Sequence, residues 1–434
     1  MVRFVRFLLG AGVVLATGVS AGCGEPRVES EVSIVSAISS GDSARMREHD
    51  HGRGSISGPV PFGTIDLTSI GVGTCTGPTS AQLWTLTNRH GLVAKLTDFG
   101  ATLVELHVPD KAGNFVDIVQ GFDSVAGYAN SQFAGATVGR VGNRIVDGIF
   151  TLDGTTYQVT GAGPAGSNNH ALHGGPCGWD KGLWTAATRL TDDGPEISFA
   201  LVSADGDMGF PGRVKARSVY KLTDDDRLEI AMSATTDQDT PINMLHHSYF
   251  NLGGAGSGTI FNHVLTLFAD EYTPAAAATG VPDGTIKSVA GTPFDFRKPH
   301  AMGLFAEQPG VGDQTPPGYD HNWVVRGDSR ALRRVARVVD PASGRTMIVE
   351  ADQPGVQFYT TNFRPDPSVT PYVPTIGKGG KEYRIHEAFA LETQKHPNAI
   401  NFPPSVRPGR EDEIIRPARG ETYHHRMVIS FGAE

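Results

Sequence analysis

Apolar and polar side chains alternate with a period of two along several short stretches beyond residue 80. In residues 103–109 (LVELHVP), Val104, Leu106 and Val108 fall on one face of an extended chain, and residues 227–234 (RLEIAMSA) alternate in the same way. Successive side chains of a strand point to opposite faces, so this period predicts β-strands with one buried face.

Other stretches extend this pattern. Residues 338–350 (VVDPASGRTMIVE) place Asp-Pro-Ala-Ser-Gly between two β-prone runs, which predicts a hairpin. Further strands are predicted in residues 263–270, 355–363 and 425–431. Helical periodicity is scarce: ALRRVARVV fits either a strand or a helix, and SVAGY forms one helical turn at most.

Composition agrees with a turn-rich protein. Glycine supplies 54 of the 434 residues, roughly 12% against a usual ~7%. No repeat of fixed period and no break in composition divides residues 81–434. We therefore predict an all-β fold, a single large antiparallel β-sandwich.

The N-terminus has the layout of a secretory signal peptide over residues 1–22. Arg3 and Arg6 precede an apolar run, and small residues lead to Cys23. A single buried helix is the alternative interpretation, although the polar sequence that follows offers it little to pack on. The Ser-Ala-Gly-Cys segment resembles a bacterial lipoprotein cleavage site, so Cys23 is a candidate for lipidation. The expected location is outside the cytoplasm, in a bacterial cell envelope or periplasm, with a lipid tether to a membrane as one option.

Residues 23–80 are rich in Ser, Gly and charge and contain few large apolar side chains, which predicts a flexible spacer. A small cap or edge hairpin on the main domain is the alternative. Residues 81–434 form the expected catalytic domain. If Cys23 carries lipid, Cys75 and Cys177 remain as an even pair that an oxidising compartment would allow to bond.

Charge and hydropathy argue against nucleic acid as a partner and against a membrane-spanning segment after the N-terminus. The chain has 46 acidic and 37 basic residues, a formal charge of −9, and so lacks the basic excess that binding to nucleic acid requires. After the N-terminal segment, no stretch has the ~18 uncharged apolar residues of a membrane span.

Polar groups that could carry chemistry lie near glycines or turns in five stretches, GATVGRVGNRI, NNHALHGG, NMLHHSYFNLGG, GYDHNW and FALETQ. Glu392 stands out, because it follows an apolar run and a buried carboxylate needs a partner. Burial also raises the pKa of a carboxyl toward a useful value for a base. The adjacent His246 and His247 should point to opposite sides of a strand, so only one faces a given pocket.

A metal site is the alternative use of these histidines with Glu392. Zinc and iron sites need two or three converging ligands, often on nearby positions of one element. Here the histidines are adjacent or isolated in separate loops, and we expect no metal.

Taken together, these stretches resemble the aldose 1-epimerase family, the galactose mutarotases. GRVGNRI, LHGG, GWDKGLW, FPG, HSYFNL, FDFRKP, YDHNW, QPGVQFYT and LETQ occur in the family's order from about residue 84 to the C-terminus. The resemblance implies the family's galactose mutarotase-like supersandwich, in agreement with the period-2 pattern.

The resemblance also implies roles for particular residues. It places a catalytic acid on His247 and a catalytic base on Glu392. It places sugar-binding residues on Arg144, with Asn143 beside it, and on His173 and Asp320. One departure is that Leu245-His246 stands where the family commonly has Thr-Asn, and we expect the His246 side chain to point away from the pocket.

The implied reaction interconverts the α and β anomers of hexoses such as glucose and galactose. The sugar ring opens when O1 loses a proton and O5 gains one, so one base and one acid suffice and no cofactor is required. An aromatic wall at Phe358 or Trp323 is expected to face the free sugar. Two alternatives remain at this point: a glycoside hydrolase with Asp320 as a second carboxylate, and a non-catalytic sugar-binding module. The sequence does not define the oligomeric state.

Overall fold

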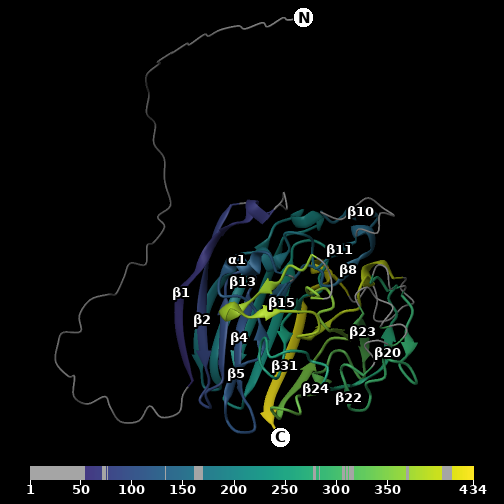
Figure 1. The fold of residues 1–434 in the computed structure, drawn as a ribbon. Helices are drawn as coiled ribbons and strands as arrows, with labels where there is room; N and C mark the ends of the chain where they lie inside the picture. The colour runs from purple at the N-terminus through teal and green to yellow at the C-terminus, as the bar shows by residue number, and fades with distance from the viewer. Residues whose placement is uncertain are drawn as a thin grey trace, which may run out of the picture. The chain divides into compact units, whose positions relative to one another are not determined.

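Antiparallel strands make up almost all of the regular structure, as the alternating pattern predicts (Figure 1). The computed structural model describes residues 54–434 except 71–74, 76, 132, 161–169, 277–279, 283, 305–307, 309–310, 312–316, 368–370 and 403–412. The expected signal peptide, Cys23 and the spacer as far as residue 53 lie outside the described residues. Within the described residues, no helix combines the length and the apolar run needed to cross a membrane.

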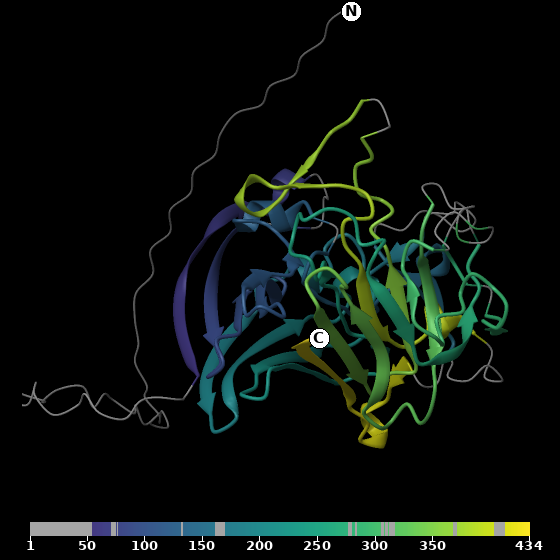
Figure 2. The ribbon, with the colours of Figure 1, turned by 60° about the horizontal axis from the view of Figure 1, so that its bottom comes forward.

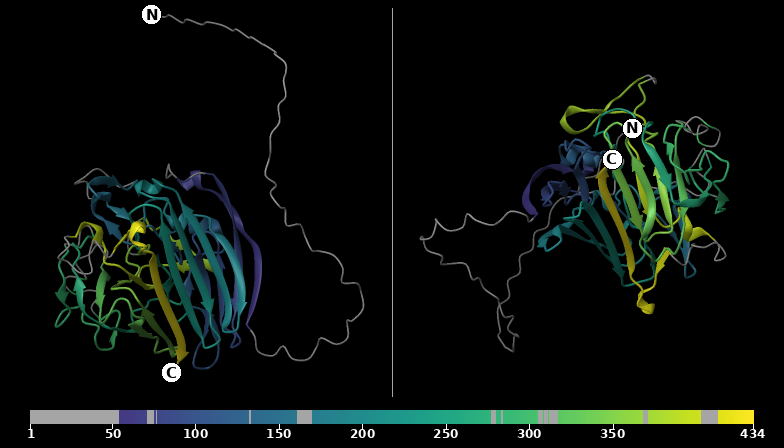
Figure 3. Two further views of the ribbon diagram at one scale, coloured as in Figure 1. Left: turned by 180° about the vertical axis from the view of Figure 1, so that it is seen from behind. Right: turned by 90° about the horizontal axis from the view of Figure 1, so that it is seen from below.

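The largest sheet has nine strands, and the C-terminal strand lies in its middle. In spatial order its strands are β12 (Thr185–Thr191), β13 (Gly194–Ser203), β14 (Val214–Leu222), β15 (Arg227–Thr236), β31 (Tyr423–Ala433), β25 (Arg345–Ala351), β24 (Arg333–Val339), β19 (Val264–Leu267) and β22 (His300–Ala301). In Figure 3, β31, in yellow, separates the teal strands from the green ones. Strand β24 lies within ALRRVARVV, the stretch whose pattern fits either a strand or a helix. Strands β24 and β25 form the predicted hairpin.

Two five-stranded sheets complete the main architecture. The first contains β1 (Ser55–Asp66), β2 (Pro78–Thr87), β3 (Val93–Thr97), β4 (Thr102–Pro109) and β5 (Phe115–Asp117). The second contains β21 (Lys287–Ser288), β20 (Ala269–Thr273), β23 (Asp320–Val325), β26 (Gly355–Tyr359) and β29 (Ala390–Gln394). The second sheet carries two of the predicted site residues, Asp320 and Glu392.

Short strand pairs connect these sheets. They are β6 (Val119–Gln120) with β18 (Tyr249–Phe250), β7 (Thr137–Val138) with β17 (Leu245–His246), β8 (Arg144–Ile145) with β11 (Ala171–Leu172), β9 (Ile149–Leu152) with β10 (Thr155–Gln158), β16 (Thr240–Pro241) with β30 (Ile414–Ile415), and β27 (Thr375–Ile376) with β28 (Glu382–Tyr383). The predicted single turn of helix is α1 (Val125–Ala129). The 3-10 turns are η1 (Leu67–Ile70), η2 (Val146–Gly148), η3 (Trp179–Lys181), η4 (Asp207–Gly209), η5 (Lys378–Gly380), η6 (Ala399–Asn401) and η7 (Pro417–Arg419).

The core lies between the sheets and confirms the predicted sandwich. One apolar cluster joins Leu106 of β4, Ile230 of β15, Val349 of β25 and Val356 of β26, each without measurable exposure. On β4 and β15, the side chains predicted to share the inner face are all buried. Because full burial of such a side chain stabilises the fold by about 1.5–3 kcal/mol, the alternating positions hold the layers together.

The N-terminal boundary of the folded part differs from the expectation of a spacer up to residue 80. Strand β1 begins at Ser55 and pairs with β2 along most of its length, so the edge-strand alternative applies to residues 55–66 (Figure 2). Most β1 side chains are exposed on both faces. Backbone hydrogen bonds to β2 hold this edge strand in place. Because neither face is largely buried, its sequence lacks the alternation of apolar and polar residues by which strands are predicted.

The two cysteines that follow Cys23 in the sequence form a disulfide bond. Cys75 and Cys177 form a disulfide with their Cα atoms 5.5 Å apart, a common separation for this bond. Cys75 is buried in a second apolar cluster that includes Phe62 and Tyr128. The bond therefore connects the segment between β1 and β2 to the loop that follows β11.

Candidate active site

The predicted site residues converge on one pocket. The cavity has a volume of about 330 Å³ and lies among the short strand pairs and the second five-stranded sheet. Its lining residues are Phe133, Asn143, Arg144, Leu172, His173, His247, Tyr249, Asp320, Tyr359, Phe363 and Glu392. All six residues assigned to the site from the sequence are among them.

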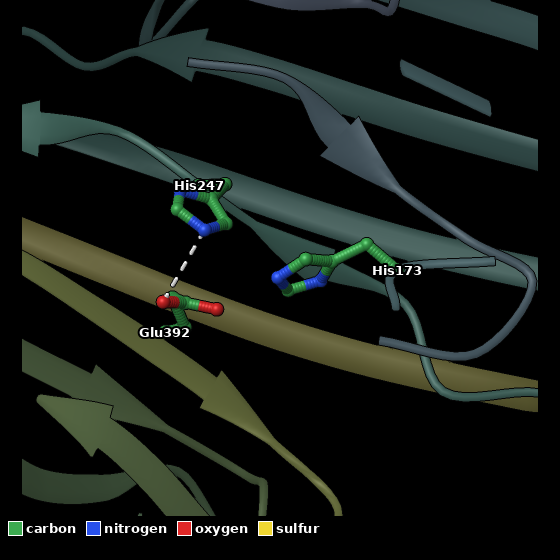
Figure 4. Close-up of side chains that lie close together, drawn as sticks. All are labelled: His173, His247 and Glu392. Carbon is green, nitrogen blue, oxygen red and sulfur yellow. Dashed lines mark ion pairs between the residues drawn. The ribbon is translucent and has the colours of Figure 1, made fainter. Parts of the chain in front are cut away.

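His247 and Glu392 lie next to each other in the wall of this pocket. The distance from His247 Nε2 to Glu392 Oε1 is 3.4 Å, and both side chains are almost fully buried. Figure 4 shows these two side chains and His173 turned toward one another. Glu392 Oε2 has no hydrogen-bond partner among the described residues. A buried oxygen without a partner is costly and is typical of a functional site.

The chain at the end of β17 directs the two histidines to different sides, as expected. The backbone of His247 is held by hydrogen bonds with Ala136 and Gly135, which place it just beyond the β7–β17 pair. His246 points to the other side, where its Nε2 lies 2.7 Å from Ser248 Oγ and its Nδ1 lies 3.2 Å from Tyr220 Oη. Only His247 therefore reaches the pocket.

Glu392 lies in the middle of β29, and all five residues of this strand are buried. Its neighbour across the ladder is Gln357 of β26. The Gln357 side chain donates a 2.6 Å hydrogen bond to Asp320 Oδ1 on β23. Three adjacent strands thus set the positions of the predicted base and of the predicted hydroxyl-binding carboxylate.

Asn143 and His173 fix each other where β8 meets β11. The His173 N–H donates to Asn143 O at 2.9 Å, and the Asn143 N–H donates to His173 Nδ1 at 3.1 Å. Because Nδ1 accepts this bond, the ring proton resides on Nε2 and is free to be donated to a ligand. Arg144, on β8, extends to Asp320 with 3.6 Å between Nη2 and Oδ2.

The aromatic wall differs from the expectation. Trp323 and Phe358 have no exposed surface and pack in the core against Phe296. The aromatic side chains that line the pocket are Phe133, Tyr249, Tyr359 and Phe363. Phe358 precedes Tyr359 on β26, and successive side chains of a strand point to opposite faces, so the prediction was wrong by one position.

Some of these missed residues had a signal in the sequence. Tyr249 lies two residues after His247, and Tyr359 lies two residues after Gln357. In an extended chain, the side chain of each tyrosine therefore points to the same face as that polar residue. Phe133 lies outside the strands, with a positive φ of 59°, and no periodicity points to it.

Burial dominates the electrostatics of the pocket. It raises the pKa of Glu392 well above its ordinary value, an effect to which the charge of Asp320 adds and which Arg144 opposes. Burial also lowers the pKa of His247 to about 4 and lowers that of His173 well below its usual range, with the neighbouring His247 contributing to the latter. The pair of Glu392 and His247 consequently binds a single proton over a wide range of pH.

The pocket also brings together groups that are able to bind a metal. One ligand atom each from His173, His247 and Glu392 lies within 4.8 Å of the others. Separation along the sequence was therefore a poor argument against a metal, because β11, β17 and β29 converge here. The same three side chains also have the chemistry of the predicted acid, base and hydroxyl donor, and removal of metal ions with a chelator distinguishes the two uses.

Comparison with known proteins agrees with this geometry. The family model for aldose 1-epimerase matches residues 82–430. The chain belongs to the aldose 1-epimerase family. It is 42% identical to galactose mutarotase of Bos taurus over 340 residues, which cover 77% of this chain and 90% of that protein. It is 37% identical to aldose 1-epimerase of Escherichia coli over 355 residues, which cover 81% of this chain and 96% of that protein.

A solved structure supports the fold assignment. The aldose epimerase homologue from C. elegans superimposes with a TM-score of 0.67 at 31% identity, covering 80% of this chain and 97% of that one. The fold, the family match and the relatives together identify an isomerase that interconverts the anomers of aldoses. The aldose 1-epimerase match begins at residue 82, so β1 and Cys75 lie before the matched region.

Proposed function

We propose that this aldose 1-epimerase opens and recloses the ring of a free aldohexose with Glu392 as base and His247 as acid. The observation that supports this most directly is the placement of two buried proton-transfer groups on one pocket, 3.4 Å apart at their nearest atoms. A sugar bound in the cavity would contact both groups, because they line the same wall of it. Proton transfer by such positioned groups accounts for rate enhancements of roughly 10²–10⁴ per group.

The chemical steps conserve the single proton of the pair. The raised pKa of Glu392 and the lowered pKa of His247 place the single proton on Glu392 in the resting pair, and its transfer to His247 gives the reactive form. Glu392 then removes the proton from the C1 hydroxyl while His247 donates its proton to the ring oxygen, so the C1–O5 bond breaks and the aldehyde forms. Rotation about C1–C2 presents the other face of the aldehyde. On closure, His247 takes back the proton from the C5 hydroxyl and Glu392 returns one to O1, which regenerates both groups.

The remaining polar groups are suited to hold the sugar hydroxyls. Arg144 and His173 offer N–H donors, and Asp320 offers acceptor oxygens that Gln357 and Arg144 hold in place. Asn143 lines the pocket beside Arg144, and its backbone N–H also donates to His173 Nδ1. Buried polar groups of this kind penalise a sugar that leaves them unpaired, which provides specificity. The cavity volume, about 330 Å³, lies at the lower end of the usual range of about 300–1,000 Å³ and suits a monosaccharide.

Polarimetry tests this proposal against its alternatives. Freshly dissolved α-glucose or α-galactose should approach its ordinary equilibrium rotation faster in the presence of the protein, with no new sugar released. Release of a second sugar from a glycoside would indicate a hydrolase. Binding without a change in the rate of approach would indicate a sugar-binding module.

We also propose that the chain is exported and that Cys23 carries a lipid. The order of charged, apolar and small residues before Cys23 supports this. The Cys75–Cys177 disulfide adds support, because such bonds persist mainly in oxidising compartments. The enzyme would then act on free sugars outside the cytoplasm.

A further inference from the structure

The loop that carries His173 is covalently tied to the segment between β1 and β2. Cys177 lies four residues after His173 and bonds to Cys75, which is 102 positions earlier in the chain. Cys75 precedes residue 82, where the family match begins. The restraint on this part of the site therefore comes from a segment that the family match does not include.

The His173 loop has a backbone conformation that needs support. His173, Gly174 and Gly175 have φ angles of 51°, 87° and 99°, so three consecutive residues lie in the left-handed region. A Cβ atom on Gly174 would lie 2.1 Å from the carbonyl oxygen of Gly139, so the two backbones are in close contact. A side-chain-bearing residue persists in this region only where its surroundings hold it, and this applies to His173.

The other end of the disulfide is firmly packed. Cys75 is 5% exposed and belongs to the apolar cluster that contains Phe62, Leu67 and Tyr128. Leu67 N donates a 3.2 Å hydrogen bond to Gly77 O nearby. The disulfide thus connects the His173 loop to a buried side chain of this apolar cluster.

A small movement of this loop would move His173, which lines the pocket. The His173 ring is placed by the hydrogen bond from Asn143 to Nδ1 and by contact with the Phe133 ring, whose centroid is 4.5 Å away. The donor that remains for the sugar, Nε2–H, has its direction set by these contacts. If the loop shifts, the donor no longer points at the same place in the pocket.

We propose that the Cys75–Cys177 disulfide is a positioning element of the active site, which holds His173 in the orientation that binds a sugar hydroxyl. This inference rests on the proposed role of His173 in sugar binding. A hydroxyl contact that is present in both the ground state and the transition state affects mainly KM. Loss of the disulfide should therefore raise KM about three- to tenfold and change kcat less than about twofold.

The test compares the full-length protein in three forms at 25 °C: untreated, reduced with dithiothreitol and then alkylated, and as the double variant Cys75→Ser/Cys177→Ser. Polarimetry on α-galactose and α-glucose gives kcat and KM, and peptide mapping reports whether Cys75 and Cys177 are linked. Half-buried Cys177 makes the bond accessible to the reductant. The double variant, assayed with and without dithiothreitol, controls for other effects of the reagent.

A variant that only destabilises the fold provides a second control. Val349 is fully buried in the core on β25 and does not line the pocket, so Val349→Ala should lower the thermal midpoint and leave KM unchanged. A rise in KM for the reduced and double-variant proteins, but not for Val349→Ala, supports the positioning role. An unchanged KM in the reduced protein overturns it, as does an equal rise in Val349→Ala or the finding of free thiols at Cys75 and Cys177.

The variant His173→Asn separates this proposal from the one on which it rests. If His173→Asn raises KM and disulfide loss does not, the positioning role is overturned and sugar binding by His173 stands. If His173→Asn leaves KM unchanged, the binding role is wrong, and the positioning role fails with it.

Discussion

His247 and Glu392 approach to 3.4 Å although they come from different parts of the fold. His247 directly follows β17, which forms a two-stranded sheet with β7, and Glu392 lies inside the five-stranded sheet on β29. Neither sheet forms the pair alone. The relative placement of the two sheets, which the buried core fixes, thus sets the geometry of proton transfer.

If this pair carries out the proton transfers, replacing either member should affect turnover more than binding. His247→Asn and Glu392→Gln should each lower kcat by roughly 10²–10⁴-fold, since each removes one positioned proton-transfer group. KM should change less. Polarimetry at saturating sugar measures the effect, and near-normal turnover in either variant would remove that residue from the mechanism.

His246 is the matched control for His247, since it is its neighbour in sequence and points away from the pocket. His246→Asn should lower the free energy of unfolding by about 1–3 kcal/mol, because Tyr220 and Ser248 lose a buried partner. Its kcat should stay within about twofold of wild type. Thermal melts and polarimetry on the same preparation test this. An inactive His246→Asn beside an active His247→Asn would mean that the strand presents its other side to the sugar.

Activity should depend on pH through the single proton of the pair. As the pH falls through about 4, the lowered pKa of His247, the pair gains a second proton and Glu392 no longer acts as a base. As the pH rises through the raised pKa of Glu392, the pair loses its only proton and no acid remains. We therefore expect kcat/KM to follow a bell with an acid limb well below pH 6.5. A limb near 6.5 would show that His247 titrates as an exposed histidine does.

Removal of metal ions should leave the activity intact. Acid–base chemistry needs His247 Nε2 and Glu392 to be free, so dialysis against a strong chelator should not change kcat/KM. Added Zn²⁺ should inhibit, because His173, His247 and Glu392 have the spacing to bind it. Loss of activity on chelation, with recovery on adding Zn²⁺, would instead establish a metal enzyme.

Lipidation of Cys23 predicts incorporation of a labelled fatty acid into the wild-type chain in a bacterial host, but not into Cys23→Ala. The reason is the cleavage-site-like segment that precedes the cysteine. Electrophoresis of membrane and soluble fractions detects the label. Unlabelled wild-type protein of mature length in the soluble fraction would indicate secretion without an anchor.

The long strands were predictable because their burial is one-sided. On β4, the inner positions Val104, Leu106 and Val108 are buried, and this one-sided burial produces the period of two in the sequence. Strand β1 was missed because backbone pairing with β2 holds it, while both of its faces are largely exposed. Alternation of apolar and polar residues indicates a strand with one buried face, and it cannot detect a strand whose two faces are both exposed.

The assembly of the site was predictable only in part. Motif resemblance selected residues that do line the pocket, including Asn143 and Asp320. The two-residue pairs β7–β17 and β8–β11, which bring distant positions together, are too short for any period to appear. Separation along the sequence therefore says little about the distance between His173 and His247, whose ring centroids are 5.1 Å apart.

The position of β31 affects when the enzyme can first become active during synthesis. Among the described strands it comes last along the chain, and it lies between β15 and β25 in the nine-stranded sheet. Until Tyr423–Ala433 has been synthesised, the strands on its two sides have no backbone partner to join them, and the core beneath them stays open to water. A stop codon just before β31 would preserve every residue of the pocket and still yield an inactive chain.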